Sequence, residues 1–449
     1  MTDSARGDAS RSYAGESTAE HLREIALYFL YIGVVGFGGP LVHIAMMEDD
    51  LVGDEGWTDQ GTFMEGLAIC NTLPGPASTQ LGIFMGWVRG GTLGALVAGG
   101  AFMLPTFVLV VCFSWLYFAY QTVPSVEAFF YGINPVVIGL VTGAAWSMGH
   151  SALAEGRTDA EFDVGQETWT VDYLLAVLLV ATLVVTVVVN PNPVVSFVAA
   201  GLVAVAVYRS TWVRRNARRV GLWGLVGAAA AGVYLLRDRV LDLLGPRVRG
   251  ALEASPVWGL LTTLWANEWV QLFLFMLYTG SFIYGGGLVL IPFIEKFVVN
   301  EFGWMTAREF VDGVAIGQLS PGPVVMTTAF VGYKLLLDAS GGAVAVAVVG
   351  ALVATVGAFG PSFVFILGFF PYFARVRDDE VVQSALLGVN AAVVGAILGA
   401  TVTLARESIV DPLTAVLAVG TFWLFHRDVD AVYLIFGGGA VGIGAFYLL

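Results

Sequence analysis

The sequence predicts an all-α polytopic membrane protein made of two inverted structural repeats, each with about five transmembrane helices and a re-entrant helical hairpin. The first observation is composition: 57% of the 449 residues are hydrophobic and 12% are charged, which is too apolar for a soluble domain of this size. The second is a proline-glycine-proline element that occurs twice inside apolar sequence, at 74–76 and 321–323. The third is a duplication of the sequence around both elements.

The charged and sulfur-containing residues narrow the class of protein. The net charge is −14, and Lys296 and Lys334 are the two lysines among 21 basic residues, a balance typical of surfaces adapted to high salt. An acidic chain also argues against nucleic-acid binding. Cys70 and Cys112 fall in apolar segments and are predicted to be free thiols. The four histidines form no cluster with metal-ligand spacing, so we expect no metal and no cofactor.

The first half begins with a disordered acidic tail, 1–20, which is followed by a repeat over 21–210. Its first span, 21–47, is interrupted at 36–40, and such an interruption is tolerated only where protein or a polar cavity covers the backbone. Each arm of the segment 63–87 is too short to cross about 30 Å of hydrocarbon, so we expect a re-entrant hairpin there. A polar loop is predicted at 151–170, and full-length spans at 92–120, 126–149, 171–189 and 194–208.

A basic linker, 211–266, separates the halves. Five arginines lie between 209 and 219, and the positive-inside rule places them in the cytoplasm. The apolar stretch 220–236 has arginines on both sides, which favours a helix lying in the membrane interface. The second repeat, 267–449, is predicted to contain a hairpin at 310–334 and spans near 270–298, 343–373, 381–405, 412–425 and 431–449.

The Pro-Gly-Pro elements predict broken helices. Proline lacks an N–H donor and clashes with the preceding turn, so a helix from Phe63 should end near Leu73 and another should begin at about Pro76. The free N–H groups and the positive dipole end of the new helix would form a buried anion site. Paired broken helices in two halves are typical of a transporter's binding site. The alternative interpretation is a kink that only lets helices pack.

The internal repeat sets the expected symmetry. A shift of 247 aligns 33–80 with 280–327 without a gap, and 17 of the 48 pairs are identical; beyond the hairpins the shift becomes 256, so that Pro105 matches Pro361 and Asn134 matches Asn390. Five crossings around a non-crossing hairpin are an odd number, so the copies should have opposite orientations unless the linker also crosses the membrane. We therefore expect substrate at the repeat interface near mid-membrane.

Three features together resemble a known family. They are the stretch Phe37, Gly38, Gly39 and Pro40 after the first helix, the paired Pro-Gly-Pro elements, and the duplication itself. With them the chain resembles a chromate transporter of the chromate ion transporter family, in its long two-domain form. The resemblance implies a multi-pass protein of the cell membrane that transports chromate, and sulfate as a second candidate, across or out of the cell. The second half departs from the first at Gly287 and Thr327, which favours closer substrate contact by the first half.

Candidate residues follow from the breaks and their polar neighbours. A tetrahedral dianion needs several donors, which backbone N–H groups, hydroxyls and amides can supply. The predicted substrate-binding residues are Gly38, Gly39, Pro40, Asn71, Pro74, Gly75, Pro76, Ala77, Ser78, Thr79, Gln80, Gly285, Gly286, Gln318, Ser320, Pro321, Gly322, Pro323, Val324, Val325 and Thr327, with Thr328 as a further donor.

Ionisable residues near the hairpins give the coupling and steering candidates. Glu65 and Asp312 are repeat mates on the incoming arms; they could carry protons, because burial favours a neutral acid, or they could cap helices at an aqueous mouth. Arg89 and Lys334 could attract an anion electrostatically or could snorkel to the interface. His43 could donate to an oxyanion or could be a packed histidine.

The leading functional hypothesis is secondary active transport of chromate, with export as its direction. Sulfate or another oxyanion is the alternative cargo, and a passive anion channel is the alternative mechanism. No nucleophile–base pair or metal cluster supports an enzyme, and no ATP-binding motif is present in the sequence. The energy should therefore come from an ion gradient, with H⁺ as the candidate coupling ion, or from another subunit. Besides the oxyanion the expected partner is the lipid bilayer, and a homodimer is left open.

Overall fold

The computed structural model describes residues 18–154, 159–164, 167–216, 255–284 and 286–448. Almost all of this chain is helical, which confirms the all-α fold class. The predicted tail up to residue 17 and the predicted interfacial helix, 220–236, lie outside the described residues.

Among the described residues, eight α-helices and one π-helical turn make up the first half. Asp59 caps the helix that enters the hairpin: its side chain accepts the Thr62 N–H at 3.0 Å, and hydrogen bonds from Thr62 hold the pKa of the Asp59 carboxyl below its usual range. The segments are α2 (Ala19–Val35), α3 (Pro40–Glu48), η2 (Asp49–Asp54), α4 (Gln60–Thr72), α5 (Ala77–Tyr120), α6 (Pro124–Ala154), α7 (Tyr173–Val189), α8 (Pro193–Tyr208) and α9 (Ser210–Arg215).

The helix α5 combines one arm of the hairpin with the next span. Gly90 and Gly91 have non-helical dihedral angles, and the φ of Gly91 is +61°. The kink separates a short arm that begins at Ala77 from a long apolar helix that ends at Tyr120. A hairpin arm and a full-length span therefore follow one another, as the sequence predicts.

The polar loop expected at 151–170 is wrong in part, because it contains a β-hairpin. β1 (Asp159–Val164) pairs antiparallel with β2 (Glu167–Asp172), with Asp159 opposite Asp172. The signal is the run of β-branched and aromatic residues at 168–171, which favours a strand although its neighbours are polar. Asp172 also caps α7 by accepting the Leu174 N–H at 2.8 Å.

The second half repeats the order of the first with more irregular turns. The first helix of the repeat is α14 (Glu268–Phe282), preceded by α13 (Pro256–Trp265). The segments that follow are η3 (Gly287–Val289), α15 (Leu290–Phe293), η4 (Ile294–Glu301), α16 (Ala307–Gln318), η5 (Val324–Met326), α17 (Thr327–Ala339), α18 (Val344–Val364), η6 (Phe365–Phe369), α19 (Phe370–Val376), α20 (Glu380–Ser408), α21 (Pro412–Phe425) and α22 (Ala431–Leu448).

Several helices meet the length and hydropathy of a membrane crossing. Among the described residues, five helical stretches do so: Ala77–Tyr120, Pro124–Ala154, Val344–Val376, Glu380–Ser408 and Ala431–Leu448. The helices α7, α8 and α21 are shorter and also apolar. Large apolar side chains such as Val188, Leu202 and Val419 are exposed on their outer faces, which fits a surface covered by lipid.

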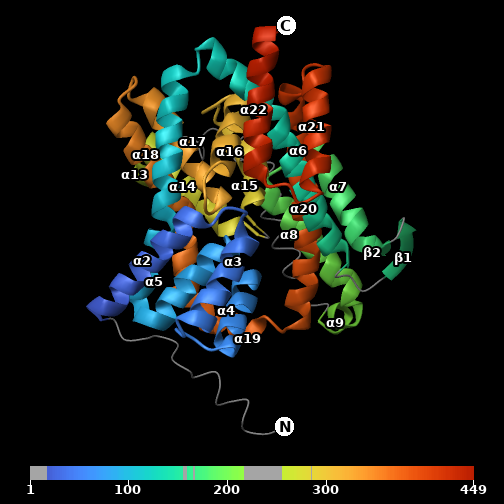
Figure 1. Ribbon diagram of the computed structural model, residues 1–449. Helices are drawn as coiled ribbons and strands as arrows, with labels where there is room; N and C mark the ends of the chain where they lie inside the picture. The colour runs from blue at the N-terminus through green and yellow to red at the C-terminus, as the bar shows by residue number, and fades with distance from the viewer. Residues whose placement is uncertain (1–17, 155–158, 165–166, 217–254, 285, 449) are drawn as a thin grey trace.

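The last three helices of each half exchange partners with those of the other half. The helix α6 packs mainly on α21 and α22, whereas α20 packs mainly on α7 and α8, and α6 and α20 also contact each other. Figure 1 shows these six helices together on the right of the molecule. We call α6–α8 with α20–α22 the interlocked bundle. Neither half can form this bundle alone.

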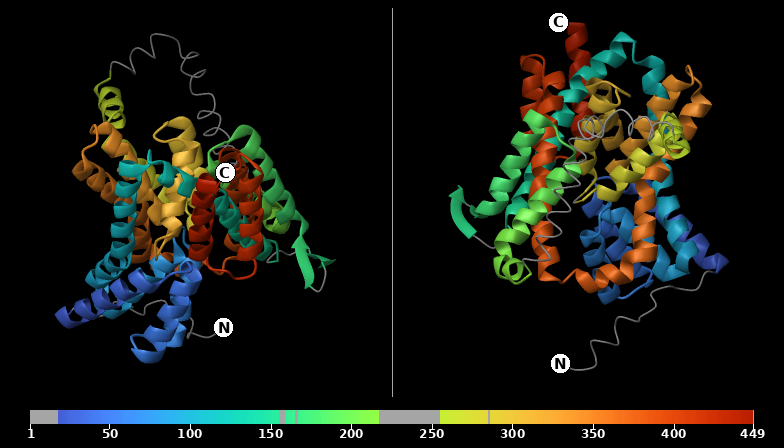
Figure 2. Two further views of the ribbon diagram at one scale, coloured as in Figure 1. Left: turned by 45° about the horizontal axis from the view of Figure 1, so that its top comes forward. Right: turned by 180° about the vertical axis from the view of Figure 1, so that it is seen from behind.

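The remaining helices carry the breaks. In the first half α2 packs along α5, and in the second half α18 packs along both α14 and α17. The helices α3 and α4 lie at one end of the molecule and α16 and α17 lie toward the other, as both Figure 1 and Figure 2 show. We call α2–α5 with α14–α19 the hairpin bundle, and its core is rich in phenylalanine, including Phe29, Phe84, Phe310 and Phe330.

Small residues let the interlocked bundle pack closely. A Cβ at Gly132 of α6 would clash with the carbonyl oxygen of Gly438 in α22, and a Cβ at Gly388 of α20 would clash with the carbonyl oxygen of Ala200 in α8. Such approach of backbones is how membrane helices gain van der Waals contact. The pair α6 and α22 corresponds to the pair α20 and α8 in the repeat. Close packing between the halves therefore depends on glycine at both Gly132 and Gly388.

We predict that Gly132→Val destabilises the protein, because the added side chain must push α22 away from α6. Overpacking of this kind costs about 1–3 kcal/mol, and thermal unfolding of purified protein in detergent would measure it. Gly437→Ala is the matched control, since a Cβ at Gly437 would meet nothing within 4 Å. Equal melting temperatures for both variants would contradict the predicted contact of α6 with α22.

Candidate functional site

The first hairpin has the break that its prolines predict. The helix α4 ends at Thr72, and α5 begins at Ala77 directly after Pro76. Between them Gly75 adopts a φ of +132°, a conformation that side chains rarely allow. The chain therefore turns inside the protein and begins a new helix, as expected.

The second hairpin breaks at the matching place but starts its outgoing arm differently. The helix α16 ends at Gln318, and the φ of Gly322 is +100°. A single 3₁₀ turn, η5, follows at Val324–Met326, and the α-helix α17 begins only at Thr327. The first hairpin has no such turn, so the two arms present different groups at their tips.

Each hairpin tip is hydrogen-bonded to the broken first helix of the other half. The Gly75 N–H donates to the carbonyl of Ile283 at 2.5 Å, and the Gly322 N–H donates to the carbonyl of Gly36 at 3.2 Å. Gly75 and Gly322 are repeat mates, and so are Gly36 and Ile283 at the same shift of 247. The contacts are thus reciprocal, and they bring the two breaks of each half to the interface between the halves.

Two further repeat mates stand beside the tips. Thr106 of α5 donates its hydroxyl to the carbonyl of Pro321, and a Cβ on Gly322 would clash with that hydroxyl. Ser362 of α18 stands in the matching place, since its Oγ would lie 2.9 Å from a Cβ on Gly75. The Thr106 hydroxyl is therefore hydrogen-bonded to a backbone carbonyl, whereas the Ser362 Oγ has no hydrogen-bond partner.

The first tip carries polar side chains that are buried and incompletely bonded. Ser78, Thr79 and Gln80 are at most 1% exposed. The Ser78 and Thr79 hydroxyl oxygens and the Gln80 Oε1 lack partners, while the Gln80 Nε2 donates to the carbonyl of Pro74 at 2.7 Å. Buried polar atoms are nearly always bonded, so unpaired ones gathered at a helix N-terminus indicate a place for a polar ligand.

The second tip is apolar or already satisfied. Val325 and Met326 stand where the first tip has Ser78 and Thr79, and both are buried. Thr327 donates to the carbonyl of Val324 at 2.9 Å. The Thr328 hydroxyl donates to the carbonyl of Val325, and the Ser320 hydroxyl donates to the carbonyl of Gly317.

The glycine breaks in the first helices shape the backbone rather than supply donors. Gly38 and Gly39 have φ values of +109° and +83°, and Pro40 occupies the first turn of α3. In the second half Gly286 has a φ of +127°, and Gly287 begins the 3₁₀ turn η3. Gly287 stands where the first half has Pro40, and the second half begins there with a 3₁₀ turn instead of an α-helix. Gly285 lies outside the described residues.

Two of the predicted amides are more exposed than the polar side chains of the first tip. Asn71 is exposed on α4, and Gln318 is half-buried at the end of α16. Neither joins the unpaired atoms of the first tip. The other predicted members form the turns themselves: Pro74 and Pro76 flank Gly75, and Pro321 and Pro323 flank Gly322.

The two carboxylates on the incoming arms differ in environment. Asp312 is 2% exposed, and the Tyr117 hydroxyl of the first half donates to its Oδ2 at 2.6 Å. The Asp312 Oδ1 has no partner, and the Asn134 amide lies nearby with its own Oδ1 unpaired. The mate, Glu65, is only half-buried on α4. The deeper acid thus belongs to the second hairpin.

The two predicted steering cations are both paired with carboxylates. Arg89 donates to Glu24 at 2.7 Å and lies over the ring of Trp57. Lys334 contacts Glu309 at 2.9 Å and Asp338 at 3.0 Å. These partners offset much of the positive charge that each side chain could offer to an anion.

His43 sits inside the first break rather than beside the first tip. Its side chain is fully buried, and its Nε2 lies 2.6 Å from the carbonyl oxygen of Gly36. A carbonyl only accepts, so the Nε2 carries a proton and donates to it, while the buried Nδ1 has no hydrogen-bond partner among the described residues. The Gly36 carbonyl therefore receives both His43 and Gly322.

Sequence reasoning missed several contributors from the opposite half. The Tyr284 hydroxyl donates to the carbonyl of Thr72 at 2.9 Å and so holds the end of α4. Ser362, Thr106 and Tyr117 also act across the repeat. The available signal was the residue after each matched proline, Pro105 and Pro361, which is a hydroxyl-bearing residue in both halves.

Glu295 is a buried carboxylate that is not among the candidate residues of the sequence analysis. It is 1% exposed within η4 and accepts hydrogen bonds from Asn190 at 3.0 Å and Asn300 at 2.7 Å. Asn190 ends α7 in a left-handed conformation, so this contact joins the two halves. The carboxylate is placed by packing that sequence alone does not reveal.

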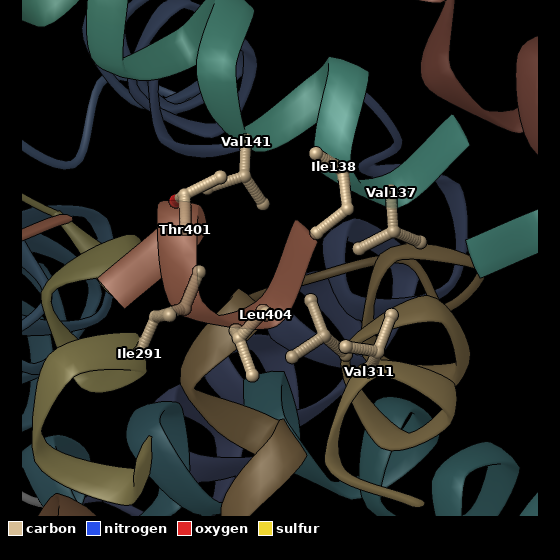
Figure 3. A pocket seen from close by; sticks show the side chains of 8 residues that line it. Val137, Ile138, Val141, Ile291, Val311, Thr401 and Leu404 are labelled. Carbon is tan, nitrogen blue, oxygen red and sulfur yellow. The ribbon is translucent and has the colours of Figure 1, made fainter. Parts of the chain in front are cut away.

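A small apolar cavity lies apart from the tips, between α6, α15, α16 and α20. Its volume is about 10 Å³, room for about one water molecule. Figure 3 shows Val137, Ile138 and Val141 of α6 on one side of it and Leu404 of α20 on another. With Thr401 as its single polar lining residue, this cavity is unsuited to a dianion.

The comparison with known sequences decides the family. The model of the chromate transporter family matches residues 23–206 and 270–443, which cover most of the chain. The chain belongs to the chromate transporter family. As a family member with several apolar helices it is a multi-pass protein of the cell membrane, and its family is one of transporters rather than enzymes.

Three relatives in the chromate transporter family are similar to this chain over nearly its whole length. A chromate transport protein of Cupriavidus metallidurans is 31% identical over 95% of this chain and 94% of its own length. A probable chromate transport protein of Synechococcus elongatus is 27% identical over 95% and 96%, and a chromate transport protein of Pseudomonas aeruginosa is 29% identical over 92% and 90%. No solved structure is significantly similar to the chain.

Proposed function

We propose that the chain is a secondary active transporter of chromate, that it exports this tetrahedral oxyanion, and that it binds it at the hairpin tips between the repeats. The observation that carries the proposal is the meeting of the four helix breaks, with unpaired buried hydroxyls at one tip. The names of the relatives support chromate as the cargo. Because the chain has no ATP-binding motif, an ion gradient supplies the energy.

The chemistry of the first tip suits a dianion. The first turn of a helix leaves N–H groups without intrahelical partners, and the dipole gives that end about half a positive charge. The hydroxyls of Ser78 and Thr79 can rotate to donate as well. A chromate ion that loses its water shell would thus regain donors from backbone and side chains without needing a free arginine or lysine.

The reciprocal contacts support the inverted arrangement of the repeats. A two-fold relation exchanges Gly75 with Gly322 and Gly36 with Ile283, and the two hairpins approach from opposite ends of the molecule (Figure 1). An axis of this kind in the membrane plane would place the tips near mid-membrane, as in other transporters with broken helices.

The packing suggests which parts move during transport. A mechanism in which the two repeats rock as rigid bodies would have to separate α6 from α22 and α20 from α8, which are closely packed through glycine. We therefore propose that the hairpin bundle moves against the interlocked bundle. Each of these bundles contains helices from both halves.

Asp312 is the proposed site of the coupling proton. It is buried, it touches Tyr117 across the repeat, and Asn134 lies beside it. Arg308 and Glu309 on the same helix are charged groups that act on it electrostatically. An unpaired Oδ1 is expensive as part of a buried carboxylate and less so as part of a neutral acid, so proton uptake and release there would accompany movement of the hairpin.

We predict saturable uptake of radioactive chromate into proteoliposomes that contain the purified protein, driven by an imposed pH gradient. Saturation follows from a defined site, and the dependence on the gradient follows from coupling. A passive channel would instead give flux that follows voltage, does not saturate and ignores the pH gradient, and this result would contradict the proposal. Excess sulfate as a competitor would show whether the site accepts a second tetrahedral dianion of the same charge.

We predict that Asp312→Asn removes the pH dependence of chromate transport, because the amide cannot bind or release the coupling proton. Transport rates would be measured across a series of external pH values at fixed membrane potential. Glu65→Gln is the matched control. Glu65 is only half-buried, so this variant should retain most of the pH dependence. Wild-type pH dependence in Asp312→Asn would remove Asp312 from the mechanism.

A further inference from the structure

The two hairpin tips have diverged in their hydrogen bonding. In most helices a serine or threonine hydroxyl can bond a carbonyl one turn earlier. At the second tip the 3₁₀ turn η5 supplies such carbonyls, and Thr327 and Thr328 use them. At the first tip Ser78 and Thr79 lie in the first turn of α5 with no 3₁₀ turn before it. The nearby Pro74 carbonyl accepts the Gln80 Nε2, and both hydroxyls are unpaired.

The helix beside each tip shows the same difference. At the second tip Thr106 closes the space by donating to the carbonyl of Pro321. At the first tip its mate, Ser362, is fully buried and donates to nothing. The Ser362 Oγ and the Gln80 side chain both border the space in front of Gly75 that a Cβ would occupy.

We propose that the oxyanion binds at the first tip alone, and that Ser362 from the second repeat completes this site together with Ser78 and Thr79. The proposal rests on the function proposed above and makes it more specific. Three hydroxyls from two directions can reach different oxygens of a tetrahedral dianion, which the N–H groups of one helix end cannot do.

The second tip then has a structural role in this scheme. Its hydroxyls are satisfied, its first turn carries Val325 and Met326, and Thr106 fixes the turn to α5. It therefore holds the interface together, while the first tip offers donors. Since Ser362 and Ser78 belong to different repeats, the bound anion bridges the repeats at this one place.

The test is transport and binding by Ser362→Ala in the full-length protein. A hydrogen bond to a charged group is strong enough that its loss should raise the KM for chromate about tenfold or more. The stabilisation of the protein by potassium chromate in a thermal unfolding assay should fall in parallel. Thr79→Val, which keeps the shape and removes the hydroxyl, should give the same pattern if Ser362→Ala proves unstable.

Thr355→Val is the matched control for the same helix. Thr355 lies two turns before Ser362, is buried, and donates its hydroxyl to the carbonyl of Ala351 at 2.8 Å, so we expect its KM to match that of the wild type. Saturable wild-type transport with unchanged KM and unchanged thermal stabilisation in both Ser362→Ala and Thr79→Val would overturn this inference alone. A wild-type protein with neither saturable chromate uptake nor stabilisation by chromate would overturn the proposed function as well.

Discussion

The structure depends on how the ends of broken helices are satisfied inside an apolar protein. A helix that stops within the membrane leaves carbonyls, and one that starts there leaves N–H groups, and each costs several kcal/mol if it stays unpaired in hydrocarbon. Here the solution is reciprocal, since the Gly75 N–H meets Ile283 and the Gly322 N–H meets Gly36. Each half is therefore incomplete without the other, and the interface forms where the breaks meet.

This constraint explains the division of the protein into two bundles. The irregular segments gather in the hairpin bundle, where side chains such as Tyr284 and Thr106 bond the remaining carbonyls. The interlocked bundle consists of regular helices, which contact each other across the halves and pack closely through glycine. The repeat mates Ser78 and Val325 carry different side chains, and so do Ser362 and Thr106, so the two copies differ at their tips.

The sequence predicted the features that local chemistry decides. Pro74 and Pro76 end one helix and start another whatever surrounds them. The apolar composition likewise predicts membrane-spanning helices. The sequence could not predict which carbonyl receives the Gly75 N–H, because that partner lies more than 200 residues away along the chain. For the same reason the sequence could not show that Asn71 is exposed or that Glu295 is buried, and Ser362 was overlooked. The strands β1 and β2 were missed because their polar residues masked a short β-branched run.

The most direct test of the account is a cryo-electron microscopy structure of the protein in lipid nanodiscs at saturating chromate. We predict density for one tetrahedral anion within hydrogen-bond distance of Ser78, Thr79 and Ser362, with the Gly75 and Gly322 turns still meeting across the repeats. Density in the apolar cavity of Figure 3 or at the second tip would contradict the account. So would hairpin tips that lie far apart with lipid or aliphatic side chains filling the space between them.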